Sequence, residues 1–520
     1  MSSSIIAYDL GTGGIKASLY ASDGQRLASV FVGYETSYPQ ASWHEQRPED
    51  WWSVLIAATR RLLVSPAADA AAIQCLAISG HSLGCVPLDR DGRLLCDATP
   101  IWSDRRAEAQ TVPFFNKVDP TEWYLTTGNG FPAAHYTVFK VLWYRDHRPD
   151  LFRQIHQIVG TKDYLNFRLT GQLRTDFSYA SGCGVYDLRK WDYAPALVAA
   201  SGLPREIWPA ISPAASILGE LTPAAATALG LPRSVKVACG GVDNSCMALG
   251  ARNIAEGRTY ASLGSSAWIA VTSAQPLLDE RVKPYVFTHV VPGLFNSAVA
   301  IFSSGSSFKW VCQQMCQDLL EQARRDDLDV YDLMSALAAA SPPGARGVIF
   351  NPSLAGGSSL DLSPLIRGAF LGLDLGHTRA DLIRAAMEGI AFNLRLALDE
   401  LRKLCRVCDQ MVVVGGSSKS ALWRQIFADT FDLTIQQTNV GQDAGSLGAA
   451  AVAAVAAGLW QDFSPIDAIH RLEAAAAPDP ATCRIYQQML PSFRNAARML
   501  AATARDAGAQ APASIRFAQA

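Results

Sequence analysis

Two segments that begin at Ile5 and Thr259 share one pattern, and this repetition constrains the fold more than any other feature of the chain. Each is an apolar run, a turn rich in Gly, Ser and Thr, and a second alternating run: IIAYDLGTGGIKASLYASDGQ and TYASLGSSAWIAVTSAQ. This pattern predicts a β-hairpin, because glycine supplies the backbone freedom of the turn. We therefore expect two domains that open with the same element and meet near residues 253–257.

Strands and helices alternate through the rest of the chain. Apolar runs predict strands at residues 73–80 and 410–416, and apolar residues near the 3.6-residue period predict helices at 48–64, 379–404, 420–431 and 444–458. Such alternation is typical of α/β layers. The end of the chain is small, polar and interrupted by proline, so we expect residues 501–520 to form a peripheral tail.

Composition excludes several classes of protein. A chain of 520 residues is long enough for two or more domains. Its net charge of -2 and the absence of a long basic run give no basic surface that would bind nucleic acid. The first residues, MSSSIIAYDLGTGG, are a poor signal peptide, and the longest apolar stretch, from Gly448, is too short to span a bilayer. The 11 scattered cysteines fit a reducing compartment. We expect a cytoplasmic enzyme without membrane or nucleic-acid partners. The sequence does not decide between a monomer and a homodimer.

Four glycine-rich turns follow apolar strands, at residues 11–14, 240–241, 264–266 and 415–418. Such turns expose N–H groups and hydroxyls that bind phosphate. One alone is more often a plain tight turn, but four at strand ends favour a nucleotide site. No Gly-Lys pair occurs, which excludes a Walker A loop, and GTGGIKASLY continues as a strand where a Rossmann turn would open a helix. A phosphate hairpin preceded by Asp9 points instead to the actin-like ATPase architecture.

The stretch ACGGVDNSCMALGAR, residues 238–252, places Asp243 at the start of a helix of small residues. The nearest basic residues in sequence are Lys236 and Arg252. A buried carboxylate without a cationic partner is costly unless it binds a metal, accepts hydrogen bonds or transfers protons. A helix N-cap is the plain alternative.

Six motifs, taken in order, resemble those of the FGGY carbohydrate kinases, and among them most closely the xylulokinases. They are DLGTGGIK, SWHEQRPEDWW, TPIWSDRRAE, GGVDNSCMALG, ASLGSSA and VVVGGSSKSALWRQIFAD. Each motif alone is weak evidence, whereas six in the family's order are strong. The resemblance runs from about residue 5 to about residue 458.

The resemblance implies an α/β fold of two actin-like ATPase (ribonuclease H-like) domains with a ligand cleft between them. Residues 1–253 would form the N-terminal domain, which binds sugar, and residues 254–500 the C-terminal domain, which binds ATP. The implied reaction is ATP-dependent phosphorylation of a ketose, first of all D-xylulose to D-xylulose 5-phosphate. Asp243 would be the general base, and Asp9 would hold Mg²⁺ through water.

The resemblance also implies the remaining site residues. Those around ATP would be Thr12, Gly13, Gly14, Lys16, Ser265 and Gly305 at the phosphates, with Gly416 and Ser420 at the adenosine. Those around the sugar would be His81, Ser82, Leu83, Trp102, Asp104 and Asn244. For Lys16, an exposed strand lysine is an equal alternative.

The chain departs from the xylulokinase pattern at GHSLG, residues 80–84, where Leu83 takes the place of a sugar-contacting histidine. The segment GGSSLDLSP from Gly356 also lacks a charged pair common in the family. Ribulose, erythrulose and glycerol are therefore alternative substrates. The alternative from another class of protein is a non-catalytic sensor of sugar or ATP. The presence of Asp9 and Asp243 argues against it, since binding alone needs no base.

Overall fold

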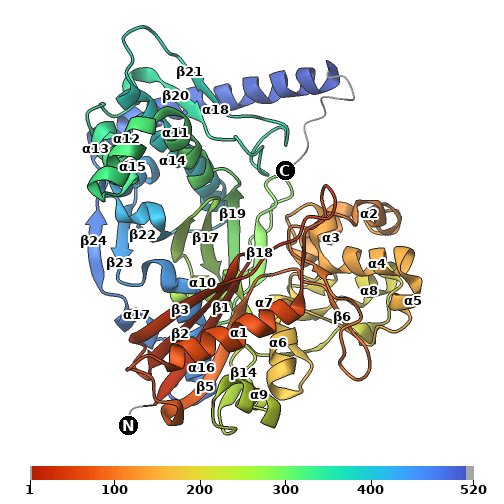
Figure 1. The fold of residues 1–520 in the computed structure, drawn as a ribbon. Helices are drawn as coiled ribbons and strands as arrows, with labels where there is room; N and C mark the ends of the chain where they lie inside the picture. The colour runs from red at the N-terminus through yellow and green to blue at the C-terminus, as the bar shows by residue number, and fades with distance from the viewer. Residues whose placement is uncertain (1–2, 511–520) are drawn as a thin grey trace.

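The computed structural model describes residues 3–510, and its framework is two mixed β-sheets (Figure 1). The first sheet has the order β13 (Ile217–Glu220), β14 (Lys236–Ala238), β5 (Ile73–Gly80), β1 (Ser4–Gly11), β2 (Gly14–Ala21) and β3 (Arg26–Gly33), and β15 (Gly241–Val242) also pairs with β5. The predicted hairpin is confirmed as the antiparallel pair β1–β2. Strands β1, β14 and β15 all run parallel to β5.

The second sheet repeats this arrangement. Its order is β18 (Tyr285–Thr288), β19 (Phe295–Ile301), β17 (Ala267–Ser273), β16 (Thr259–Leu263), β22 (Gln410–Gly415), β23 (Thr434–Thr438) and β24 (Leu472–Ala476). The second predicted hairpin is confirmed as the antiparallel pair β16–β17, and β22 runs parallel to β16. In each sheet, therefore, the first strand of the hairpin pairs on its other side with a parallel strand.

The predicted helices agree with the structure within two residues at each end. They are α1 (Pro48–Leu63), α14 (Arg379–Leu404), α15 (Ala421–Phe431) and α16 (Ala444–Ala456). Pro48 and two acidic residues form the first turn of α1, as its sequence indicated. The boundary expected at residue 500 falls inside α18 (Pro480–Gln510), so residues 501–510 continue a helix instead of starting a tail. Residues 511–520 lie outside the described residues.

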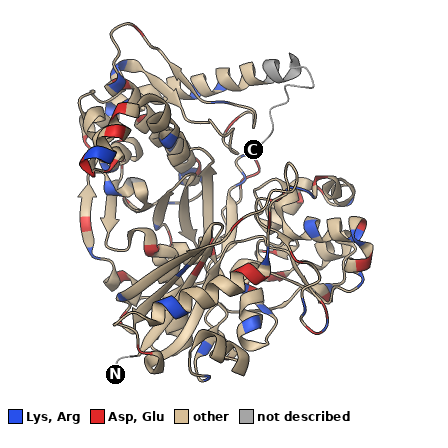
Figure 2. Ribbon diagram, in the orientation of Figure 1, with Lys and Arg blue, Asp and Glu red and all other residues tan. Residues whose placement is uncertain are grey.

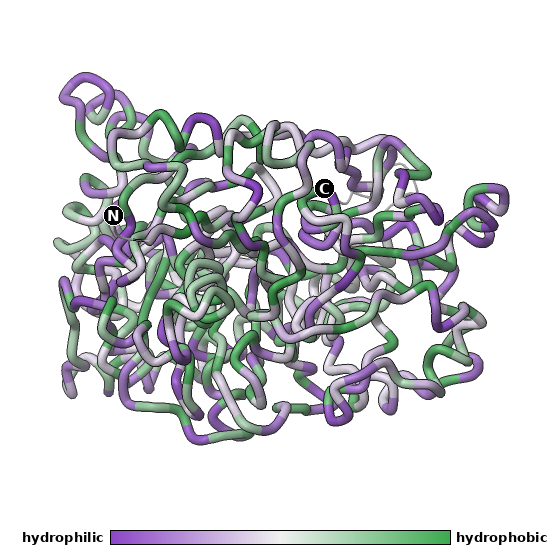
Figure 3. Tube along the Cα trace, turned by 90° about the horizontal axis from the view of Figure 1, so that it is seen from below, coloured by the Kyte–Doolittle hydropathy of each residue, from purple (hydrophilic) through white to green (hydrophobic). Residues whose placement is uncertain are grey.

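A large insertion follows β5 in the first half and forms the lobe drawn at the right of Figure 1. It contains the helices from α2 (Glu108–Phe115) to α8 (Pro195–Ser201), packed around buried aromatic residues. Charged residues of both signs are spread mainly over the outer helices and loops (Figure 2), and the tube in Figure 3 shows hydrophilic residues on the outer loops. No helix in residues 3–510 combines the length and hydropathy that a membrane span requires.

Helices α10 (Asp243–Gly250) and α16 cross in backbone contact between the two sheets. A Cβ atom on Gly448 would lie 1.9 Å from the carbonyl oxygen of Cys246, and one on Gly250 would lie 1.8 Å from that of Ala444. The alanines of α16 pack in one cluster with residues of both sheets. The small-residue composition of these helices therefore permits an approach that larger side chains would block.

We predict that Gly448→Ala destabilises the protein by about 1–3 kcal/mol, the usual range for overpacking. Helix propensity alone gives the opposite sign, since alanine is favoured over glycine by about 1 kcal/mol in a helix. The measurement is the urea midpoint of unfolding. Gly219→Ala in β13 is the control, because its Cβ would lie 3.7 Å from its nearest neighbour, an ordinary contact. A Gly448→Ala protein as stable as the wild type would contradict the close crossing.

Candidate active site

Parallel strands of the first sheet bring two carboxylates to one edge. The register aligns Asp9 of β1 with Ser79 of β5, and Ser79 with Gly241 of β15. The Ser79 hydroxyl donates to Asp9 Oδ1 at 3.0 Å. Asp243 follows two residues after Gly241, and the negative charge of Asp9 contributes to a raised pKa of Asp243. The residues predicted as metal ligand and general base are therefore neighbours, although 234 positions separate them in the sequence.

The Asp243 carboxylate is held by its neighbour alone. The backbone N–H and the side-chain amide of Asn244 donate to Asp243 Oδ1 at 2.8 and 2.9 Å, and no described residue donates to Oδ2. Burial raises the pKa of Asp243 to about 7, with Asn244 opposing and Asp9 adding to the shift. Val242 occupies the N-cap position of α10, so the carboxylate is not used as a helix cap. It is suited to exchange a proton near neutral pH.

The glycines before Asp243 serve packing. Gly240 has a φ of +73°, and a Cβ there would lie 2.2 Å from the carbonyl oxygen of Ile78. A Cβ on Gly241 would lie 2.4 Å from the side chain of Val290. Both glycines are therefore required by close contacts with the protein itself.

A buried ion network that the sequence analysis missed supports the same segment. Lys162 Nζ lies 2.5 Å from Asp163 and 3.0 Å from Asp176. Asp176 accepts a hydrogen bond from the backbone of Ser178, whose hydroxyl accepts from the N–H of Val242 at 2.9 Å. Burial acts to lower the pKa of Lys162, but the carboxylates outweigh it and raise that pKa. The network fixes the residue immediately before Asp243.

Asp9 lies against the N-terminus of α16. A Cβ on Gly445 would lie 2.5 Å from Asp9 Oδ2, so only glycine leaves this carboxylate its present position. Burial raises the pKa of Asp9, while Ser79 and Lys16 lower it. Lys16 Nζ itself lies 3.2 Å from Asp443, which also pairs with Arg26. Lys16 is therefore a half-buried, ion-paired lysine, and its role at the phosphates stays a prediction.

The surroundings of Asp9 fit a magnesium ion that is coordinated mainly by phosphate and water. Among residues 3–510, no group of three or more His, Cys, Asp or Glu side chains could hold a metal. A single carboxylate matches Mg²⁺, which retains several waters and takes its other ligands from nucleotide phosphates. The half-buried carboxylate of Asp9, next to the first glycine-rich turn, would provide that one ligand.

The first glycine-rich turn joins β1 to β2 through Thr12 and Gly13. A Cβ on Gly14 would lie 2.6 Å from the carbonyl oxygen of Val32, whereas one on Gly13 would meet nothing within 4 Å. Gly13 therefore borders open space, as a phosphate-binding turn requires. The Trp102 indole donates to the Thr12 hydroxyl at 2.9 Å, which links this turn to the predicted sugar loop.

The second turn is exposed in the same way, and the structure places Ser265 beside Gly305 as predicted for a common site. The N–H of Gly305 donates to the carbonyl of Gly264, and the N–H of Ser306 donates to that of Ser265, both at 3.0 Å. Gly305 opens α11 (Gly305–Met315). The turn therefore lies at a helix N-terminus, a favourable place for anions.

The predicted adenosine residues follow β22. Gly415 pairs in register with Leu263 at the end of β16, so this turn and the Ser265 turn share one edge of the second sheet. Gly416 is exposed, and a Cβ there would meet no atom within 4 Å. The hydroxyl of Ser420 accepts from the N–H of Trp423 at 3.4 Å and caps α15.

The segment at residues 81–83, which was predicted to lie at the sugar, is buried in the structure. Both ring nitrogens of His81 are buried without a partner in the described residues, and burial lowers the pKa of His81 to about 3. Ser82 is also buried. Leu83, with a φ of +58°, packs in the aromatic core of the inserted lobe. A Cβ on Gly182 would lie 2.8 Å from Leu83 Cδ2. Leu83 is therefore a buried core residue here, and its contact with the sugar stays a prediction.

Trp102 and Asp104 lie in one loop but have different surroundings. Trp102 is half-buried and reaches Thr12, whereas Asp104 is fully buried and pairs with Arg106 at 2.8 Å. Asp104 Oδ2 also accepts from the N–H of His44 at 2.7 Å. Asp104 therefore anchors the loop, and its contact with a sugar stays a prediction.

The sequence analysis also missed Lys140, which ties the two sugar-side loops together. Its Nζ donates to the carbonyls of Leu83 at 3.0 Å and Ile101 at 2.6 Å. Burial lowers the pKa of Lys140 to about 8, partly opposed by Asp104. In the sequence VFKVLW this lysine gives no sign of burial, because its partners lie 57 and 39 positions away.

The fold and these turns define a class, the two-domain α/β kinases that act on carbohydrates. The chain belongs to the FGGY family of carbohydrate kinases: the model of the N-terminal domain matches residues 4–250, and that of the C-terminal domain matches residues 259–457. It is therefore an ATP-dependent carbohydrate kinase, and the recognition of this family from sequence motifs is confirmed.

Its relatives include kinases of two named sugars. The xylulose kinase of Klebsiella pneumoniae is 30% identical over 451 residues, 87% of this chain and 89% of that one. The gluconokinase of Bacillus subtilis is 25% identical over 509 residues, 96% of each chain. The crystal structure of ligand-bound xylulose kinase from Lactobacillus acidophilus is similar with a TM-score of 0.88 and 25% identity, covering 97% of this chain and 99% of that one.

Proposed function

We propose that this kinase phosphorylates D-xylulose, with Asp243 as the general base. The observation that carries the proposal is the half-buried Asp243 carboxylate with a raised pKa and a free Oδ2, beside Asp9 at one sheet edge. The similarity to xylulose kinases supports the sugar.

The charges around the predicted sugar residues favour a neutral sugar over gluconate. Gluconate carries a carboxylate, which needs a cation to compensate its desolvation. The buried cations beside these loops are already bound. Lys140 binds two carbonyls, Arg106 binds Asp104 and Glu45, and Lys162 binds Asp163 and Asp176. Asp243 would repel a second carboxylate. A ketose, which has hydroxyls and a carbonyl only, avoids this cost.

In the proposed step, Asp243 Oδ2 takes the proton of the sugar hydroxyl while that oxygen forms a bond to the γ-phosphorus of ATP. The bond between the γ-phosphorus and the bridging oxygen breaks, and ADP leaves with that oxygen. Backbone N–H groups of the turns at Gly13 and Ser265 bind the phosphates, Gly416 and Ser420 lie at the adenosine, and Asp9 holds Mg²⁺. When bound, Mg²⁺ neutralises phosphate charge.

The sugar contacts follow from the same geometry. Trp102 presents an apolar ring, which suits the C–H face of a sugar, and Asn244 lies next to the base. His81 has two buried nitrogens without protein partners among the described residues, and we assign these to the sugar hydroxyls as part of the proposal. The hydrogen bond from Trp102 to Thr12 connects the sugar side to the first phosphate turn.

We predict that Asp243→Asn lowers kcat by about 10²- to 10⁴-fold, the usual contribution of a general base. In the wild type, kcat/KM should fall tenfold per pH unit below pH about 7, because the base is then protonated, and should level off above it. Both are measured by coupled ADP release. Asp91→Asn, on an exposed turn, is the matched control and should change neither quantity. Wild-type turnover by the Asn variant would remove Asp243 from the mechanism.

A substrate panel tests the sugar. We expect xylulose to have the highest kcat/KM, with ribulose and erythrulose lower by only about two- to tenfold, since one hydrogen bond is worth about 0.5–1.5 kcal/mol. Gluconate should be the poorest substrate. The Asp243→Asn enzyme gives the background rate for each sugar. If gluconate is preferred, the xylulose assignment fails and the kinase class stands. If the kcat/KM for xylulose exceeds that for the other ketoses by several orders of magnitude, the expectation that the site discriminates weakly among ketoses is wrong.

A further inference from the structure

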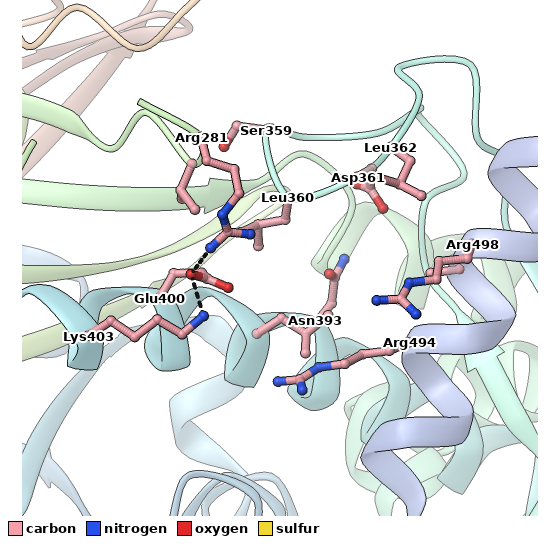
Figure 4. Close-up of a pocket in the computed structure, with 13 residues that line it drawn as sticks. Arg281, Ser359, Leu360, Asp361, Leu362, Asn393, Glu400, Lys403, Arg494 and Arg498 are labelled. Atoms are coloured by element: carbon pink, nitrogen blue, oxygen red, sulfur yellow. Dashed lines mark hydrogen bonds and ion pairs between the residues drawn. The ribbon is translucent and has the colours of Figure 1, made fainter. Parts of the chain in front are cut away.

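A cavity of about 580 Å³ lies between α14, α18 and two loops of the second half, and it contains none of the candidate active-site residues (Figure 4). Residues 281–282 form one rim, residues 359–362 form another, and the two helices form the floor and the side. Its volume is in the range of small-molecule sites. Nothing in the kinase reaction requires it.

Basic residues dominate its polar lining. Four cations, Arg281, Lys403, Arg494 and Arg498, face two carboxylates, Asp361 and Glu400. Glu400 pairs with both Arg281 and Lys403, and Asp361 accepts from the N–H of Ser358 at 2.8 Å. The carboxylates are therefore already engaged, and the cavity has an excess of positive charge.

The two arginines of α18 are arranged as a pair. Arg494 and Arg498 are one helical turn apart, so their side chains lie on the same helix face, and both extend towards the cavity in Figure 4. Arg494 reaches Asp399 at 3.0 Å, and Arg498 makes no ion pair with any described residue. Two guanidinium groups so placed offer several donors to a tetrahedral anion.

Asn393 provides an independent indication of a ligand. It lies on α14 and is only 6% exposed, and its amide points into the cavity in Figure 4. This amide makes no hydrogen bond with any described residue. The amide faces the cavity and is satisfied by no described protein group, so a polar group of a bound molecule can pair with it.

We propose that this cavity binds a small organic molecule that carries a phosphate group. The phosphate is bound by Arg498 and Arg494, and a polar group of the ligand pairs with Asn393. The organic part contacts the apolar wall, to which Val282, Leu360 and Leu396 contribute. This second site is separate from the ATP and sugar sites.

Isothermal titration calorimetry with phenyl phosphate tests the proposal, because this probe joins an apolar ring to one phosphate. We expect saturable binding to the full-length protein that weakens with added salt. Arg498→Ala should weaken it at least tenfold and Asn393→Ala several-fold. Arg324→Ala, which removes an exposed arginine of α12 (Gln317–Asp326), is the matched control and should bind as the wild type does.

Two further ligands complete the test. Phenol should not bind, and inorganic phosphate should bind more weakly than phenyl phosphate. The turnover of Arg498→Ala without the probe should equal that of the wild type, which separates this site from the reaction. The proposal is overturned if phenyl phosphate does not bind, if Arg498→Ala binds it unchanged, or if phenol binds equally well. Equal binding of inorganic phosphate would overturn the organic part.

Discussion

The crossing of α10 and α16 is the contact on which the proposed active site depends. Gly448 and Gly250 bring the two backbones together at distances that exclude any side chain. α10 begins with Asp243, and α16 begins beside Asp9, with Gly445 against that carboxylate. The same packing that joins the two sheets therefore sets the positions of both carboxylates. One arrangement thus serves both the stability of the fold and the proposed catalytic site.

Two buried lysines stabilise the backbone around this arrangement. Lys162 and Lys140 are both fully buried, which is rare for lysine unless it is paired. Lys162 organises the carboxylates and the hydroxyl that hold Val242, and Lys140 binds two carbonyls of the loops on the sugar side. Neither lysine pairs with Asp243, whose pKa is raised by burial, while the backbone around it is held by these contacts.

The sequence predicted the elements better than the contacts. Hairpins, the helix at residues 379–404 and the strand at 73–80 were found because their signals are local: turn glycines and apolar periodicity. Asp9 and Asp243 were selected because motifs mark them. The burial of Leu83 and Asp104 could not be predicted, since a motif position does not say which way a side chain points, and their surroundings come from distant segments. Lys140 and Lys162 were missed for the same reason, as their partners include segments up to 77 positions away.

Gly445→Ala is the most direct test of the claim that α16 sets the position of Asp9. The new Cβ would lie 2.5 Å from Asp9 Oδ2, at the end of a side chain that can rotate, so the fold should persist while the carboxylate moves. The measurement is kcat with saturating sugar and MgATP, together with the midpoint of thermal unfolding. The account predicts a loss of kcat of at least about tenfold, as for a displaced catalytic group, with an almost unchanged midpoint. Wild-type kcat in a folded Gly445→Ala enzyme would contradict it.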